Sequence, residues 1–239
     1  MPTATKAIVL NSLKYGDTSL IVRMYTEQAG RQAYLLKGVL GRRKGGLRAG
    51  FFQPLTQLEV VAGNSRSGKL GYLKEALIGY PYASIHSDVR KGAIALFLSE
   101  VLSESIREEE PNSELYSYLE HTLQWLDQHG QVANFHLRFL LGLTRYLGFY
   151  PDQTDPGAPY FDLAEGAFCR KPGLNPVLSG PNLESFRKIL GINFDAIHEV
   201  ELTQGRRREL LKSLLLYYEI HLQGFKQPRS LTVFDEVFS

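Results

Sequence analysis

Apolar and polar residues alternate with a period of two along the first eighty residues. The pattern occurs in five segments separated by turn residues: 6–13, 19–25, 31–39, 53–63 and 69–80. Successive side chains of a strand point to opposite faces of a sheet, so each segment can bury one face. We therefore predict five short strands, a number that suits a small barrel.

The period changes to about 3.6 after Tyr82, which is typical of helices that bury one stripe of side chains. Apolar stripes predict helices at residues 88–106, from Asn112 or Ser113 onward, and at 132–147, 183–190 and 206–222. The helix at 132–147 is apolar nearly all round, so we place it centrally. We divide the chain into a strand-rich domain at residues 1–80 and a helical domain at residues 81–239.

One part of the helical domain breaks the periodicity. Residues 151–182 contain six of the eleven prolines. Proline removes a backbone donor and interrupts both helix interiors and central strands. We expect an irregular region there, with a short hairpin at residues 160–168.

Charge is distributed unevenly along the 239 residues. Residues 1–80 carry twelve Lys/Arg and four Asp/Glu, a balance of +8, whereas residues 81–239 carry fifteen and twenty-one, a balance of −6. A basic amino-terminal part joined to an acidic body favours a module that binds a polyanion. The single cysteine, Cys169, excludes an intramolecular disulfide, and no apolar run suits a membrane span, so we expect a cytoplasmic protein without a membrane partner.

Basic residues concentrate in the segment GRRKGGLRAGFF. Its cations lie among glycines, which let a backbone come close to phosphates, and basic side chains attract nucleic acid independently of sequence. We expect Phe51 and Phe52, at the end of this segment, to be buried. The candidate DNA-binding residues are Arg23, Lys37, Arg42, Arg43, Lys44, Arg48, Arg66 and Lys69.

An enzyme acting on nucleotides or nucleic acid is the alternative. Residues 63–69, GNSRSGK, have the glycine and lysine spacing of a phosphate loop, but Leu70 stands where Ser or Thr must hold magnesium. The carboxylates at residues 108–110 are expected to be surface residues, since consecutive side chains of a helix diverge. No histidine pair has zinc spacing and no nucleophile motif is present. We therefore predict no catalytic residue, no metal site and no cofactor.

The chain resembles the RecO family of bacterial DNA repair proteins along nearly its whole length. The resemblance rests on TKAIVLNSLKYGDTSLIVRMYTEQAGRQAYLLKGV, the basic loop, FFQPLTQLEV, LTRYLGFYPD and YFDLAEGAF. It implies an α+β protein: a five-stranded OB-fold barrel followed by a helical domain. It also implies binding of single- and double-stranded DNA, annealing of complementary strands, and loading of RecA on DNA covered by single-strand-binding protein, with RecR as partner.

The chain departs from the family in one respect. Many members carry a four-cysteine zinc knuckle after the LGFYP-like sequence, but here only Cys169 of the four cysteines is present. We expect the zinc to be lost and the hairpin to be held by Tyr160, Phe161 and Phe168.

The resemblance also implies recognition of the acidic carboxyl-terminal tail of single-strand-binding protein, which ends in an apolar residue. Such a peptide needs an apolar slot beside cations. We assign the slot to Leu141, with Leu140 and Leu143, beside Arg138 and Arg145. A second candidate is the basic triplet that opens the last helix, Arg206, Arg207 and Arg208.

Overall fold

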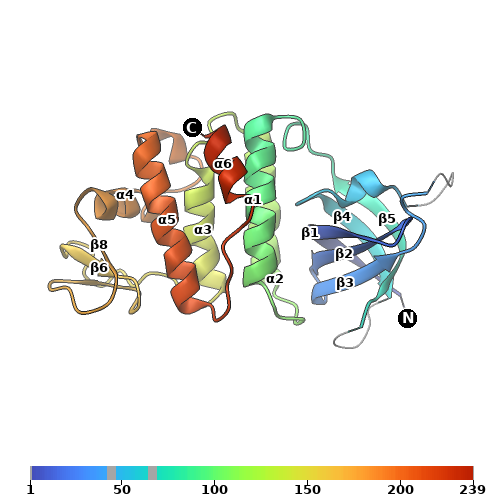
Figure 1. The fold of residues 1–239 in the computed structure, drawn as a ribbon, viewed down its shortest axis with the longest axis horizontal. Coiled ribbons are helices and arrows are strands. Elements are labelled where there is room, and N and C mark those ends of the chain that lie inside the picture. The colour runs from blue at the N-terminus through green and yellow to red at the C-terminus, as the bar shows by residue number, and fades with distance from the viewer. Residues whose placement is uncertain (1, 42–46, 64–68, 239) are drawn as a thin grey trace. The chain divides into compact units, whose positions relative to one another are not determined.

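The structure, a computed structural model, describes residues 2–41, 47–63 and 69–238. It divides into two compact units, Met1–Gln128 and His129–Ser239. The first unit contains a five-stranded sheet and two helices, and the second contains the remaining helices and a small sheet (Figure 1). The boundary that we predict after residue 80, between strands and helices, lies inside the first unit.

The sheet of the first unit is antiparallel and follows the order β3-β2-β1-β4-β5. Its strands are β1 (Thr3–Tyr15), β2 (Ser19–Thr26), β3 (Gly30–Leu36), β4 (Gln57–Gly63) and β5 (Tyr72–Tyr80). The ladder is open, and an isolated bridge from Tyr34 to Gly71 links its two ends. This arrangement confirms the predicted five strands and is consistent with an OB fold, which is a partly open barrel.

The inward face of this sheet forms the core of the first unit. Val22 and Met24 are fully buried there, and Val60 is 2% exposed. The short 3-10 helix η1 (Ala49–Phe52) closes one side, with Phe52 buried and Phe51 packed against the same cluster. The expected burial is therefore confirmed for Phe52, whereas Phe51 is only half-buried.

Two helices complete the first unit: α1 (Val89–Ser105) and α2 (Ser113–Gln128). Asp88 caps α1, because its side chain accepts a hydrogen bond from the backbone N–H of Lys91 at 3.0 Å. Near the end of α2, the Asp127 carboxylate accepts hydrogen bonds from the backbone N–H groups of Ala83, Ser84 and Ile85. These bonds fix the connection between β5 and α1 against α2.

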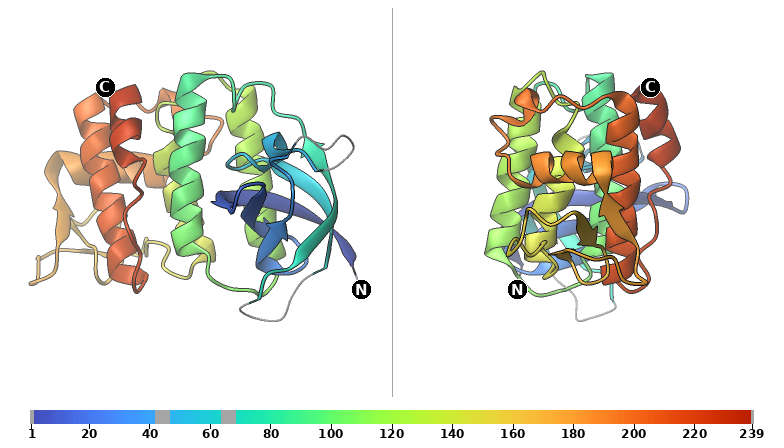
Figure 2. Two further views of the ribbon diagram at one scale, coloured as in Figure 1. Left: turned by 45° about the vertical axis from the view of Figure 1, so that its right-hand side comes forward. Right: turned by 90° about the vertical axis from the view of Figure 1, so that its left-hand side faces the viewer.

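The second unit combines four helices with a three-stranded sheet of order β7-β6-β8 (Figure 2). Its helices are α3 (Phe135–Tyr146), α4 (Gly180–Leu190), α5 (Gln204–His221) and α6 (Leu231–Val237), with the 3-10 helix η2 (Ile197–Glu199) before α5. Its strands are β6 (Tyr160–Asp162), β7 (Ala167–Cys169) and β8 (Val177–Ser179). Tyr218 of α5 donates a hydrogen bond to the Leu140 carbonyl of α3 at 2.7 Å, so these two helices pack directly.

The predicted hairpin at residues 160–168 is confirmed by the pairing of β6 with β7. Phe161 is fully buried, and its ring lies 5.0 Å from that of Phe168 and 4.6 Å from that of Phe186. Strand β8 and helix α6 were not predicted. Among the described ranges, none of the helices combines the length and apolar character that crossing a membrane requires.

Candidate nucleic-acid interface

Three of the predicted DNA-binding cations are exposed in the first unit, each next to the end of a strand or of a 3-10 helix. Lys37 follows β3, Arg48 precedes η1, and Lys69 precedes β5. Backbone hydrogen bonds hold these segments, because Leu35 N–H donates to the Gly71 carbonyl at 3.0 Å. Because the bridge between Tyr34 and Gly71 is parallel, Lys69 lies before this contact and Lys37 lies beyond it, on opposite sides of the bridge. Arg42, Arg43, Lys44 and Arg66 lie outside the described residues.

The turn between β1 and β2 adjoins the segment that follows Lys37. Leu40, which belongs to the segment after β3, donates its backbone N–H to the Thr18 carbonyl at 2.9 Å. This bond places the end of the β1–β2 hairpin beside the segment that leads into the basic loop. Lys37 therefore lies at the hairpin end of β1 and β2, whereas Lys69 lies next to the paired residues Gly63 and Tyr72, near the start of β1.

Arg23 does not belong to this group. It is half-buried on β2, and its Nη1 lies 3.4 Å from Asn11 Oδ1. Asn11 in turn donates to Ser103 Oγ of α1 at 3.1 Å. Arg23 thus lies on a face of the sheet that contacts α1, and its contact with DNA stays a prediction.

Sequence reasoning missed two exposed tyrosines beside the basic segments. Tyr15 ends β1 and is 56% exposed, and Tyr72 begins β5 and is 54% exposed. Tyr72 lies opposite Gly63 in the β4–β5 register, where a side chain at position 63 would overlap its ring. A large exposed aromatic side chain beside phosphate-binding cations can stack on an unpaired base. Their position directly before or after a turn was the available sequence signal.

The segment that resembles a phosphate loop connects two antiparallel strands. Gly63 ends β4, and Lys69 precedes β5, which pairs with β4; residues 64–68 lie outside the described residues. A phosphate loop instead leads from a strand into a helix, whose first N–H groups bind the phosphates. The segment lacks this helix, so the geometry argues against the alternative of a nucleotide-hydrolysing enzyme.

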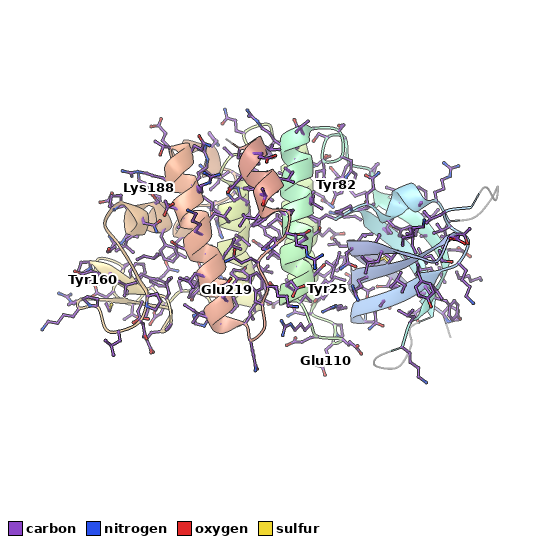
Figure 3. All side chains as sticks on the ribbon, in the orientation of Figure 1. Tyr25, Tyr82, Glu110, Tyr160, Lys188 and Glu219 are labelled. Carbon is purple, nitrogen blue, oxygen red and sulfur yellow. The ribbon has the colours of Figure 1, made fainter. Side chains whose placement is uncertain are left out.

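The carboxylates at residues 108–110 are exposed, as expected. Their backbone rather than their side chains has a structural role, since the Glu108 carbonyl accepts a hydrogen bond from Arg31 N–H at 3.1 Å. Glu110 and Tyr25 are labelled in Figure 3, and the Tyr25 hydroxyl donates to the Asn112 carbonyl at 3.3 Å. Burial raises the pKa of Tyr25 to about 12. The loop after α1 is thus fixed against β2 and β3.

The region in which we expect the zinc knuckle to be lost does not fit a zinc ion. It retains a single thiol, Cys169, and the Asp155 carboxylate lies 3.1 Å from Nε of Arg170, the residue after Cys169. Across the described ranges, no group of three or more His, Cys, Asp or Glu side chains is arranged to hold a metal ion.

Protein contacts hold the hairpin instead. The buried Asp162 carboxylate accepts hydrogen bonds from the backbone N–H groups of Ala164 and Glu165 at 2.9 and 3.0 Å and from the Asn175 side chain. Burial raises the pKa of Asp162, but these hydrogen bonds lower it further, so that it lies below its ordinary value. The Asp162 carboxylate therefore binds together the two sides of the Pro-rich region.

The apolar slot predicted on α3 is not on the surface. Leu141 is fully buried, as are Leu140 and Leu143, so these side chains fill the core. Arg138 donates from Nε to the Ile192 carbonyl at 2.7 Å, and the exposed Arg145 lies 4.4 Å above the Tyr150 ring. The prediction that Leu141, Arg138 and Arg145 flank a peptide is therefore corrected, because the helix is central and its arginines have local partners.

The basic triplet lies in the first turns of α5. Thr203 caps the helix by accepting from the backbone N–H of Arg206 at 3.3 Å. Arg206 is exposed, Arg207 is half-buried and donates to the Leu202 carbonyl, and Arg208 forms an ion pair with Asp235 at 3.0 Å. Burial lowers the pKa of Arg207. The first turns of α5 are therefore cationic, and α6 covers part of them.

Comparisons with known proteins agree over both units. Residues 1–82 match the family model described as Recombination protein O N terminal, and residues 86–231 match Recombination protein O C terminal. The chain is 46% identical over 234 residues to the DNA repair protein RecO of Christiangramia forsetii, covering 98% of each chain. It is 42% identical over 239 residues to that of Flavobacterium psychrophilum, covering 100% of each. Against the RecO of Bacteroides fragilis the identity is 39% over 239 residues, covering 98% of each.

Proposed function

The chain belongs to the RecO family and has a role in DNA repair, and from this premise we propose that it is a non-enzymatic mediator that binds and anneals DNA. It binds single- and double-stranded DNA through the first unit and brings complementary strands together. It assists the loading of RecA on single-stranded DNA covered by single-strand-binding protein. No bond is made or broken in this role.

The exposed cations on separate segments of the first unit are the observation that carries the proposal. Lys37, Arg48 and Lys69 project from separate segments into solvent. Each ammonium or guanidinium can neutralise one phosphate and release its counterions. Two strands whose phosphates are neutralised repel each other less, so that pairing becomes possible.

Exposed aromatic rings support a preference for unpaired bases within the same proposal. Tyr15 and Tyr72 are each more than half exposed beside the basic segments. A stacked base is worth about 1–3 kcal/mol and needs no particular sequence. The surface therefore suits an annealing protein, which must hold single strands of any sequence and release a duplex.

Two protein partners belong to the proposal. RecR is proposed as a partner from the family resemblance. The acidic tail of single-strand-binding protein is proposed to bind at the start of α5, where Arg206 and Arg208 offer cations to its carboxylates. This second site replaces the buried slot on α3.

The proposal is tested by replacing Lys37, Arg48 and Lys69 together by alanine. We expect weaker binding of single-stranded DNA at every base sequence. The slope of log affinity against log salt should fall in magnitude by about 0.7 for each lost phosphate contact. Fluorescence anisotropy with labelled oligonucleotides at several salt concentrations measures both quantities, and strand annealing should slow in parallel.

A matched control removes three exposed lysines of the second unit, Lys171, Lys188 and Lys226 (Lys188 is labelled in Figure 3). This variant changes the net charge by the same amount, and the slope of its log affinity against log salt should stay close to that of the unchanged protein. Equal slopes in the first variant and the unchanged protein would refute the proposed interface. Assays of ATP hydrolysis and of DNA cleavage on the same samples test the enzyme alternative, and turnover of either substrate would overturn the non-enzymatic proposal.

A further inference from the structure

The last helix of the chain packs against the start of α5. Figures 1 and 2 show α6 beside the end of α5 that carries the basic triplet. Both rings of the segment face this surface: Phe234 lies 4.7 Å and Phe238 5.9 Å from the ring of His136 on α3. The two phenylalanine rings stack on each other at 4.7 Å. The segment thus inserts an aromatic pair between α3 and α5.

An ion pair completes this contact. Arg208 approaches Oδ2 of Asp235 with Nε at 3.1 Å and with Nη2 at 3.0 Å. The space left among these groups, which Gln204, Arg207 and Leu211 also line, is about 20 Å³. A volume of that size holds about one water molecule, so α6 fills the surface closely.

The chemistry of α6 matches that of the partner peptide. Residues 231–238, LTVFDEVF, place two carboxylates beside aromatic side chains, and the proposed partner is an acidic peptide that ends in an apolar residue. We infer that the surface formed by His136, Arg207, Arg208 and Leu211 is the docking site for such a peptide and that α6 occupies it as an internal competitor. The inference rests on the peptide-binding part of the proposed function and adds a regulation of that site.

The connection to α6 allows it to leave the site without unfolding α5. Helix α5 ends at His221, and Phe225 is then anchored with its ring 5.5 Å from that of Tyr218. Residues after this anchor lead to α6, which spans only Leu231–Val237. A helix of seven residues is marginal by itself, so α6 depends on its contacts with α3 and α5. A peptide that makes the same contacts can displace it.

This competition separates two substitutions that break the same ion pair. Arg208→Ala removes a cation that both α6 and the external peptide use, so peptide binding should not become tighter. Asp235→Asn weakens only the internal competitor, so peptide binding should become tighter. A merely structural ion pair would give the same direction of change for both variants.

The probe is a fluorescein-labelled peptide of four aspartates followed by a carboxyl-terminal phenylalanine, and anisotropy is measured with the full chain. If α6 covers the site in nine-tenths of the molecules, the apparent affinity is reduced about tenfold. We therefore expect Asp235→Asn to tighten binding about three- to tenfold. Arg208→Ala frees the site to the same extent but also removes a charge-assisted contact of the peptide, so this variant should bind the peptide at least about tenfold more weakly than Asp235→Asn and no more tightly than the unchanged protein. Glu219→Gln, on the exposed side of α5 (Figure 3), removes one carboxylate elsewhere and should change nothing.

The outcomes distinguish this inference from the function on which it rests. If the unchanged protein binds the peptide and the Asp235→Asn variant binds it equally or more weakly, α6 is not an internal competitor. The peptide site itself would then still stand. Absence of binding in every variant would overturn the peptide-binding proposal and the inference together, and the DNA measurements above would remain independent. A circular dichroism spectrum shows whether each variant is folded.

Hydrogen exchange of the unchanged protein gives a second measurement that needs no substitution. Saturating peptide should accelerate exchange of the α6 amides while those of α5 stay protected, because the peptide replaces α6. Unchanged exchange in α6 with peptide bound would contradict displacement. Size-exclusion chromatography of the same samples tests whether α6 of a second copy occupies the site. A dimer that the peptide dissociates would overturn competition by α6 of the same chain.

Discussion

Gly30 shows how one residue fixes the contact between the sheet and the loop after α1. Its φ is +59°, a conformation that side chains other than glycine rarely adopt. A Cβ at this position would overlap the backbone carbonyl of Glu110. Backbone cannot move aside as a flexible side chain can. Both the turn between β2 and β3 and its packing on residues 108–110 therefore require glycine.

We predict that Gly30→Ala destabilises the first unit by about 3 kcal/mol or more. A left-handed conformation costs a non-glycine residue about 1–2 kcal/mol, and the overlap with Glu110 adds to it. Thermal or urea unfolding measures the loss. Gly16→Ala is the matched control, because Gly16 has φ +62° but no atom within 4 Å of a Cβ. A loss equal to that of the control would show that the contact with Glu110 contributes nothing.

Tyr15 and Tyr72 give a second prediction at this scale. Replacing both by leucine keeps apolar area but removes the flat aromatic face, so stacked bases lose their partner. Affinity for single-stranded DNA should fall about thirtyfold or more, because two stacked bases at about 1–3 kcal/mol each lose their partner, while affinity for blunt duplex changes little. Anisotropy with matched single-stranded and duplex oligonucleotides measures both. An equal fall for the two ligands would assign the tyrosines to phosphate contact or to folding.

Among the secondary-structure elements, those with repeated periodicity were predictable from sequence. The predicted helix at residues 88–106 is observed as Val89–Ser105, since its apolar stripe repeats over several turns and Asp88 caps it. Helix α6 has seven residues, too few for the stripe to repeat, and is stabilised by contacts with α3 and α5.

Strand β8 and the site residues show where local patterns fail. Val177–Ser179 lies in the Pro-rich region and becomes a strand because Leu178 pairs with Phe161, a contact far away in sequence. The slot around Leu141 failed for a related reason: an all-apolar helix indicates burial, and burial removes its leucines from the surface. Exposed cations such as Lys37 and Lys69 were predictable because charge density along the chain is a local property.

The hairpin of β6 and β7 should depend on Asp162 and not on zinc. We predict that the purified protein holds no stoichiometric zinc and that a chelator leaves the hairpin intact. Asp162→Asn should lower the stability of the hairpin by about 1–3 kcal/mol, because the new amide presents a donor where the Asn175 side chain needs an acceptor. Elemental analysis and hydrogen exchange of residues 160–169 measure these effects. About one zinc per chain, or loosening by the chelator, would contradict this prediction.

Acidic pH should destabilise the hairpin of β6 and β7 as Asp162→Asn does. The hydrogen bonds hold the pKa of folded Asp162 below its ordinary value of 3.8, so the carboxylate stabilises the fold above about pH 4. That stabilisation is lost as pH falls through the folded pKa. Protection of residues 160–169 should therefore decrease below pH 4 in the unchanged protein. It should change much less in Asp162→Asn, and equal acid sensitivity of both proteins would show that another group titrates.

The charge of the whole molecule is arranged differently from the two-part division of the sequence. Residues 81–128 carry three Lys/Arg and nine Asp/Glu, a balance of −6, and residues 129–239 carry twelve of each. The acidic excess therefore lies in and around α1 and α2, in the same compact unit as the basic sheet. A field of this kind attracts DNA to the basic segments and repels it from the acidic helices.

We predict that this repulsion weakens when Glu108, Glu109 and Glu110 are replaced together by glutamine. Their side chains are exposed, and glutamine preserves the backbone that receives Arg31 and packs on Gly30. Affinity for DNA should rise about two- to fivefold at low salt, because fewer negative charges oppose the phosphates. The gain should fade toward 1 M salt, where the screening length falls from about 10 Å at 0.1 M to about 3 Å.

The gain in DNA affinity should depend on where the charges lie and not on net charge, so the control variant changes the net charge equally in another part of the chain. Glu184, Glu199 and Glu201 are exposed in the second unit, and their joint replacement by glutamine also adds three charges. We expect a smaller gain from this variant, since its carboxylates belong to the second unit and not to the unit that carries the basic sheet. Anisotropy across the same salt series measures the gain of each variant. Equal gains would mean that only total charge matters and that the acidic helices do not direct DNA to the basic segments of the sheet.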